Sequence, residues 1–178
     1  PKLSGFSGSL MYTADETDTG PAVNRAVGAG FDWSGNGFGL GLGYHDRKAS
    51  ATADRRDLLL AGSYKFSGWQ IGAQYSRYEA SDDSFDQRSW GLSSRTKLGS
   101  GEVLLSYIDL DDKRVQDGGA RKLSIGYYYA LSKRTTVYTV LAYIDNDGRG
   151  KFAVGPDKQV VAAGDSARNL QIGIRHNF

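Results

Sequence analysis

The chain has 178 residues, with 22 basic and 20 acidic side chains and a formal net charge of +2. Cysteine is absent, which excludes a disulfide framework and thiolate metal sites, and the dispersed basic residues argue against a nucleic-acid binder. No segment approaches the run of about 18 apolar residues that a membrane helix needs, and Pro1–Ser4 does not begin a signal peptide.

Apolar residues alternate with polar or very small ones in ten segments, which predicts strands with two different faces. In the third segment, Phe38, Leu40, Leu42 and Tyr44 alternate with glycines. In chain order the predicted strands are residues 6–12, 23–33, 37–44, 57–66, 69–76, 90–98, 103–107, 122–131, 136–144 and 170–178. The ninth is ambiguous, because either Val137, Leu141 and Tyr143 or Tyr138, Val140 and Ile144 could form its apolar face.

Short and long connections alternate strictly along the chain. The short ones are residues 34–36, 67–68, 99–101 and 132–135. The long, polar ones are residues 13–22, 46–54, 79–86, 111–119 and 145–166. Membrane barrels sort their connections in this way, with short periplasmic turns and long outer loops, whereas a soluble sandwich has no reason to do so.

Aromatic residues gather near both ends of the predicted strands. Beside the short connections lie Trp33, Phe38, Phe66 and Trp69, and towards the long ones lie Tyr12, Tyr44, Tyr75, Tyr107 and Tyr143. Aromatics favour strands in general, but their placement at both ends is typical of the two girdles where rings meet lipid headgroups. We therefore predict an all-β fold, a transmembrane antiparallel up-and-down β-barrel, with residues 1–178 in a single domain.

The strand positions opposite the apolar residues are candidate pore-lining sites. They are Arg55, Asp57, Lys65, Gln70, Gln74, Arg95, Lys97, Lys122 and Arg175. The charges among them are mostly basic, with Asp32 and Glu102 as further acidic counterweights. Basic charges on a pore wall attract anions, which predicts a mild anion preference. An equal alternative is that these charges only solvate the wall and pair with the acidic residues.

Three patterns suggest other chemistry and are weak. The glycines of residues 35–43 lack the GxGxxG spacing and a following helix, so they predict small lumen residues. Residues 145–148 resemble the start of a calcium loop, but Pro156 stands where the liganding Glu is needed. His45 and His176 are the only histidines, and no GxSxG elbow occurs. We expect no metal, no cofactor and no enzyme activity.

Three segments resemble the general porins of Gram-negative bacteria, especially the β-proteobacterial type. The final segment, Asn169–Phe178, resembles the family's C-terminal strand, Tyr127–Tyr138 its penultimate hairpin, and Pro1–Leu10 a mid-chain strand. The resemblance implies a trimeric outer-membrane barrel of about 16 strands, of which this chain holds the last ten. It also implies that the constriction loop lies upstream of Pro1, and that Phe178, with Ile174 and Ile172, forms an assembly signal.

These expectations leave two alternatives. The ten strands either belong to a larger barrel, incomplete here on its N-terminal side, or close on themselves, since ten is an even number within the barrel range. The expected function is passive diffusion of small hydrophilic solutes and ions through a water-filled pore. Its rival is a structural or adhesive barrel that binds a partner through its long loops, with a barrel enzyme as a remote third. Expected partners are the lipid bilayer, lipopolysaccharide, the outer-membrane assembly machinery and two further copies in a homotrimer, but no nucleic acid.

Overall fold

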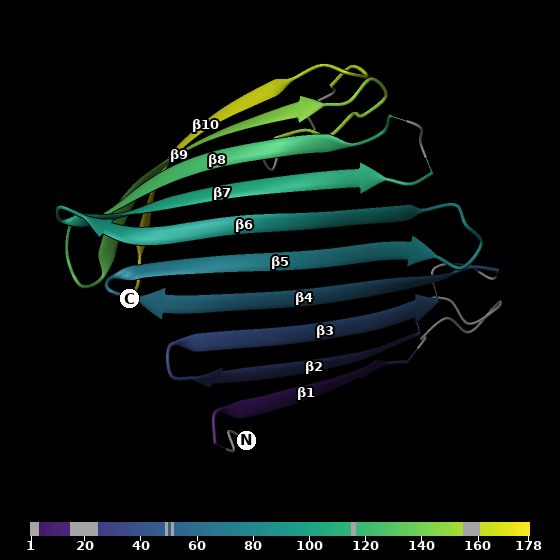
Figure 1. The fold of residues 1–178 in the computed structure, drawn as a ribbon, viewed down its shortest axis with the longest axis horizontal. Helices are drawn as coiled ribbons and strands as arrows, with labels where there is room; N and C mark the ends of the chain where they lie inside the picture. The colour runs from purple at the N-terminus through teal and green to yellow at the C-terminus, as the bar shows by residue number, and fades with distance from the viewer. Residues whose placement is uncertain (1–3, 15–24, 49, 51, 115–116, 155–160) are drawn as a thin grey trace.

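The computed structural model describes residues 4–14, 25–48, 50, 52–114, 117–154 and 161–178. Ten strands form one antiparallel sheet in chain order (Figure 1). They are β1 (Phe6–Thr13), β2 (Ala26–Gly35), β3 (Phe38–Lys48), β4 (Asp54–Phe66), β5 (Trp69–Ala80), β6 (Asp86–Leu98), β7 (Gly101–Asp112), β8 (Ala120–Ala130), β9 (Thr135–Asn146) and β10 (Ala167–His176). The predicted all-β, up-and-down arrangement is confirmed. Val23, assigned to the second strand, lies outside the described residues.

The strand register sorts the side chains onto two faces. Leu42 on β3 is paired with Phe31 on β2 and Leu60 on β4, so the large apolar residues share one face. We call this the apolar face and the opposite one, which carries Ser63 and Gln70, the polar face. The register also settles the ninth strand: Leu141 pairs with Ile125 and Leu170, so Val137, Leu141 and Tyr143 lie on the apolar face.

The two kinds of connection lie at opposite ends of the sheet (Figure 1). At one end are residues 36–37, 67–68, 99–100 and 131–134. At the other are the described residues of the longer connections, which are 14, 25, 50, 52–53, 81–85, 113–114, 117–119, 147–154 and 161–166. In the first two short turns both residues have positive φ (Asn36 51°, Gly37 84°; Ser67 43°, Gly68 84°), which is the type I′ hairpin geometry that follows strand twist.

Several strands extend further towards the long loops than the sequence pattern predicts. β3 continues to Lys48 and β5 to Ala80. Backbone pairing continues at these ends, where Lys48 pairs with Asp54 and Ala80 with Arg55. Asp46 of β3 also lies opposite Arg56 of β4, with their side chains 3.4 Å apart. Charged residues that the sequence pattern assigned to the connections therefore belong to paired strands.

The sheet is open. β1 and β10 form its two edges, and no backbone pairing joins them within the described residues. The closed ten-stranded barrel is therefore not what these strands form. Unpaired N–H and C=O groups along an edge are not tolerated in hydrocarbon, so within a membrane each edge needs a further strand.

Most large apolar side chains are exposed instead of buried. Leu170 is 64% exposed and Leu123 56%, both on the apolar face. Such a surface would be unstable in water but is what lipid solvates. The described residues hold one small buried cluster, at the long-loop end of β8 to β10. No helix among them is long and apolar enough to cross a membrane.

Candidate functional site

The middle of the polar face is lined by small side chains. The register places Ser63, Gly72, Ser93, Ser106 and Ser124 in one row across β4 to β8. A hollow of about 460 Å³ lies over this row, and Gln70 and Gln74 also line it. Small polar residues on consecutive strands leave room for water along the inner wall of a barrel.

The short-turn end of the polar face carries an excess of positive charge. Lys65, Arg95, Lys97 and Arg175 lie there, with Glu102 as the carboxylate of the group. Two adjoining hollows of about 620 and 480 Å³ share Arg95, Lys97 and Glu102 in their lining. Arg175 lines the first hollow and Lys65 the second, so the fold gathers four cations from β4, β6 and β10 at one mouth of the sheet.

Arg95 and Glu102 form an ion pair across β6 and β7. This pairing neutralises one cation of the group and leaves Lys97 facing the same hollow. Glu102 therefore weakens the electrostatic field of Arg95 at a distance, because a paired charge has a weaker field than an isolated one.

The charges at the long-loop end of the polar face are more evenly paired. Arg55 Nε lies 3.2 Å from Asp57 Oδ1, and His45 Nδ1 lies 3.6 Å from Asp57 Oδ2. The Arg55 guanidinium also lies 4.9 Å from the ring centre of Phe85. Asp57 thus lies between two basic side chains, and its carboxylate offsets positive charge at this end of the polar face.

All nine candidate pore-lining residues lie on the polar face in the register. Six of them line the hollows: Gln70 and Gln74 the central one, Lys65, Arg95, Lys97 and Arg175 those at the short-turn end. Arg55, Asp57 and Lys122 lie towards the long loops. The nine residues therefore share one face of the sheet.

Sequence reasoning missed two tyrosines of the polar face. The rings of Tyr128 on β8 and Tyr138 on β9 stack at 5.5 Å between centres. Tyr128 stands between two apolar-face tyrosines, so its phase in the strand could have placed it on the polar face. Tyr138 could not be placed, because the ninth strand had two possible phases.

The apolar face is bounded by aromatic residues at both strand ends. Phe38 and Tyr64 stack at 4.3 Å near the short turns, and Trp90 and Tyr107 lie 5.4 Å apart towards the long loops. Three of the tyrosines at the long-loop end donate hydrogen bonds to the carboxylate two residues further on: Tyr44 to Asp46, Tyr107 to Asp109 and Tyr143 to Asp145, at 3.2–3.5 Å. This matches the predicted pair of girdles.

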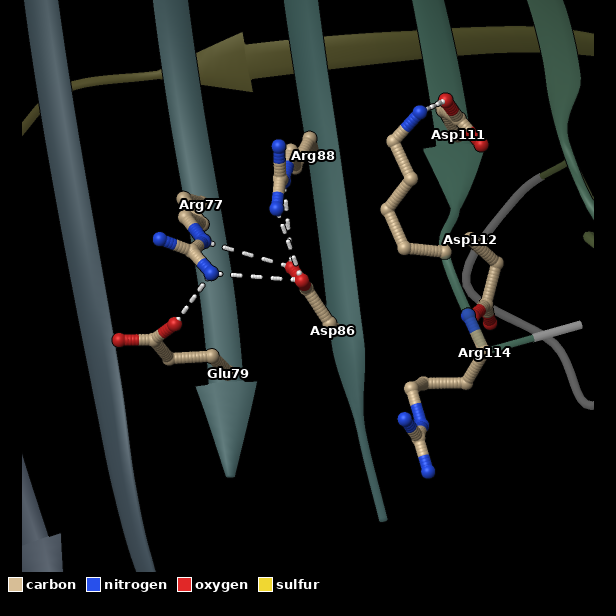
Figure 2. A network of polar contacts seen from close by, with 8 residues as sticks. Arg77, Glu79, Asp86, Arg88, Asp111, Asp112 and Arg114 are labelled. Atoms are coloured by element: carbon tan, nitrogen blue, oxygen red, sulfur yellow. Dashed lines mark hydrogen bonds and ion pairs between the residues drawn. The ribbon is translucent and has the colours of Figure 1, made fainter. Parts of the chain in front are cut away.

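Beyond these tyrosines a belt of paired charges continues on the same face. Asp86 lies 3.0 Å from Arg88 and 3.3 Å from Arg77, and Arg77 also contacts Glu79 at 2.6 Å. Figure 2 shows these side chains together. Arg121 joins Asp109 at 3.4 Å on the next strands. Charges are costly against hydrocarbon, so this belt marks the level where the apolar band ends.

A sheet with an apolar band between aromatic girdles on one face, and a hollowed, charged surface on the other, is the wall of a membrane-spanning β-barrel. A sequence model described as Gram-negative porin matches residues 1–149, and the chain belongs to that family. It is accordingly a protein of the outer membrane of a Gram-negative bacterium.

Individual relatives agree. The chain is 30% identical over 197 residues to outer membrane porin protein 32 of Delftia acidovorans, covering all of this chain and 54% of that protein. An outer membrane porin of Bordetella pertussis is 24% identical over 226 residues, with 100% and 55% covered. The solved anion-selective porin from Comamonas acidovorans superposes with a TM-score of 0.88 at 29% identity, covering 100% of this chain and 57% of that one. The chain thus spans about half the length of the curated relatives it matches.

Proposed function

We propose that the chain forms part of the wall of a water-filled pore for passive diffusion of small hydrophilic solutes and ions, with a mild preference for anions. The proposal concerns the intact protein, in which further strands pair with the edges of β1 and β10. Family membership supports a diffusion channel, and no catalytic step is assigned to any residue.

The observation that carries the anion preference is the charge at the short-turn end. Two adjoining hollows are lined by four basic residues and one acidic residue: Lys65, Arg95, Lys97 and Arg175, with Glu102. A wall of one sign raises the local concentration of counter-ions and repels like ions. The Comamonas relative is an anion-selective porin, which agrees with this direction.

The test is ion selectivity of the intact protein in planar bilayers. Replacing Arg95, Lys97 and Lys122 together by Glu should shift the reversal potential in a salt gradient towards cation preference. The matched control replaces Arg77, Arg88 and Arg121, which lie on the apolar face, by Glu and should leave the reversal potential nearly unchanged. An unaltered permeability ratio in the first variant would contradict the anion preference, and absence of ohmic channels in the unmodified protein would contradict the pore.

We further propose that the belt around Asp86 meets the headgroups of lipopolysaccharide. Its arginines have donors that suit phosphate, and its carboxylates suit the divalent cations between phosphates. Adding lipopolysaccharide should raise the unfolding temperature of the detergent-purified protein. Replacing Arg77 and Arg88 by Gln should reduce that increase, while the Lys97→Gln control on the polar face should retain it.

Two other partners follow from the family resemblance. A homotrimer is expected, and the mass of the intact protein extracted in mild detergent tests it. The assembly machinery is expected to recognise the strand end that carries Ile172, Ile174 and Phe178.

A further inference from the structure

One part of the polar face is apolar. Leu104 of β7 and Val140 of β9 lie in one row across the sheet, with Gly126 of β8 between them. Tyr128 and Tyr138 lie side by side in the next polar-face row towards the short turns. We call the two tyrosines, the leucine and the valine the tyrosine patch. Apolar surface on a wall that faces water is unfavourable, so the patch is stabilised when an apolar part of a solute covers it.

The two tyrosine rings are held close to the wall. They stack on each other at 5.5 Å between centres, with 21° between their planes. The Tyr128 ring lies over Gly126, where a Cβ would come 3.0 Å from it. The Tyr138 ring lies over Gly173, where a Cβ would collide with it. Both tyrosines are only half-buried, so they form a fixed aromatic surface that stays accessible from the polar face.

Basic side chains lie at one end of the tyrosine patch. Leu104 and Tyr128 line the hollow of about 620 Å³ at the short-turn end. Lys97 and Arg175 line the same hollow, and both are exposed. The third cation there, Arg95, is already paired with a carboxylate. Lys97 and Arg175 are therefore the charges that a solute in this hollow meets.

The tyrosine patch also borders the central hollow. Leu104 and Tyr128 line that hollow of about 460 Å³ as well, beside Ser106 and Ser124. The patch thus lies between the small polar side chains in the middle of the wall and the cations at the short-turn end. A solute that moves along this wall meets the aromatic surface and the cations in turn.

The aromatic surface and the cations together favour one kind of solute. An inorganic anion would use the cations alone, and a neutral sugar would use the rings alone. An aromatic carboxylate uses both, because its flat ring stacks on tyrosine while its carboxylate lies beside a lysine or an arginine. We propose that the tyrosine patch, with Lys97 and Arg175, is a weak binding site for aromatic carboxylates on the pore wall. The inference rests on the proposed pore and names a class of solute for it.

Benzoate is the probe for this site. In planar bilayers that contain the intact protein, benzoate should reduce the chloride current in a saturable way, because a bound solute occupies the path of other ions. Cyclohexanecarboxylate has the same charge and a similar size but no flat ring, and it should need a several-fold higher concentration for the same block. Acetate should give no block.

Tyrosine variants test which residues carry the block. Replacing Tyr128 and Tyr138 together by Ser should raise the half-blocking concentration of benzoate by about three- to tenfold, which corresponds to a lost aromatic contact. The matched control replaces Tyr127 and Tyr129, which lie on the apolar face of the same strand, by Ser and should leave that concentration unchanged. Replacing Tyr128 and Tyr138 by Phe keeps the rings and should keep the block, which separates the loss of the rings from poor assembly.

Binding is also tested without conduction, by protection of an introduced cysteine. Thr136 lines the same hollow as Tyr128, and the 178 residues contain no cysteine. In the intact protein, benzoate should slow the modification of Thr136→Cys by a water-soluble thiol reagent, and acetate should not. The control is Ser63→Cys on β4, four strands away from Tyr128 on the same face, which should react at the same rate with and without benzoate.

The outcomes separate the site from the pore. Channels in which benzoate neither blocks nor protects more than acetate overturn the site and leave the pore standing. A Thr136→Cys variant that the reagent cannot reach also overturns the site, because another part of the intact protein then covers the hollow. Equal effects of benzoate and cyclohexanecarboxylate overturn the aromatic class of solute. Protection by benzoate in a protein that forms no channels overturns the proposed pore, while binding to this face stands.

Discussion

The ring of Tyr138 on β9 covers Gly173, its register partner on β10, on the polar face. A Cβ at residue 173 would collide with the hydroxyl and ring of this tyrosine. Tyr138 in turn stacks on Tyr128, which limits how far its ring can move. The pair of strands β9 and β10 therefore needs glycine at position 173 because the tyrosine ring leaves no room for a side chain, and not because the backbone turns there.

This contact predicts that Gly173→Ala destabilises the barrel. Overpacking a close contact costs about 1–3 kcal/mol, and urea unfolding of the protein refolded in lipid measures it. Gly43→Ala is the matched control, since a Cβ there meets only ordinary contact with Leu59 at 3.8 Å. Tyr138→Ser should make Gly173→Ala nearly neutral; equal losses with and without the tyrosine would show that its ring is not the cause.

The ion pair of Arg95 and Glu102 predicts opposite shifts in selectivity from its two members. Glu102→Gln leaves Arg95 uncompensated and should strengthen anion preference. Arg95→Gln leaves the carboxylate uncompensated and should weaken it, while the double variant should return close to the unmodified value. Reversal potentials at low salt, where screening is weak, measure all three. A Glu102→Gln variant with an unchanged reversal potential would argue against a carboxylate that offsets Arg95 in the intact protein.

Neighbouring residues of β8 provide a test of which face meets lipid. Ile125 lies on the apolar face near the middle of the strand, and Ser124 lies on the polar face. Arginine near the bilayer midplane costs about 2–4 kcal/mol on the lipid side of a barrel. Ile125→Arg should therefore lower the free energy of unfolding by that amount, and Ser124→Arg should change it little. Similar losses for both variants would contradict the sorting of faces.

Phe178 predicts a separation between stability and assembly. Its ring lies beyond β10 and is fully exposed apart from an edge contact with His176, at 5.0 Å between ring centres. If Phe178 only added burial, its deletion would cost at most about 1.5–3 kcal/mol and cellular insertion would be normal. As part of an assembly signal, its deletion should leave refolding into detergent nearly intact and sharply reduce insertion in cells. Surface protease accessibility in cells decides between the two results.

The sequence by itself determined the ten strands, the two faces of all of them but the ninth, and the sorting of their connections. Each strand needs one apolar and one polar face, and this requirement is visible in the sequence as apolar and polar residues at alternate positions. It also determined the aromatic girdles, because the aromatic residues stand in the sequence beside the short and the long connections. The family resemblance of the C-terminal segments pointed to the same fold.

Only the tertiary structure decided the features that depend on neighbouring strands and distant loops. The phase of the ninth strand was set by Ile125 and Leu170 on the strands beside it. The open edges at β1 and β10 and the pairing of Arg95 with Glu102 required knowing which strands are adjacent. The burial of Val154 was hidden for the same physical reason: it packs on Ala120 of β8 and on Ala142 and Ile144 of β9, which meet it only when the two strands and the loop pack together.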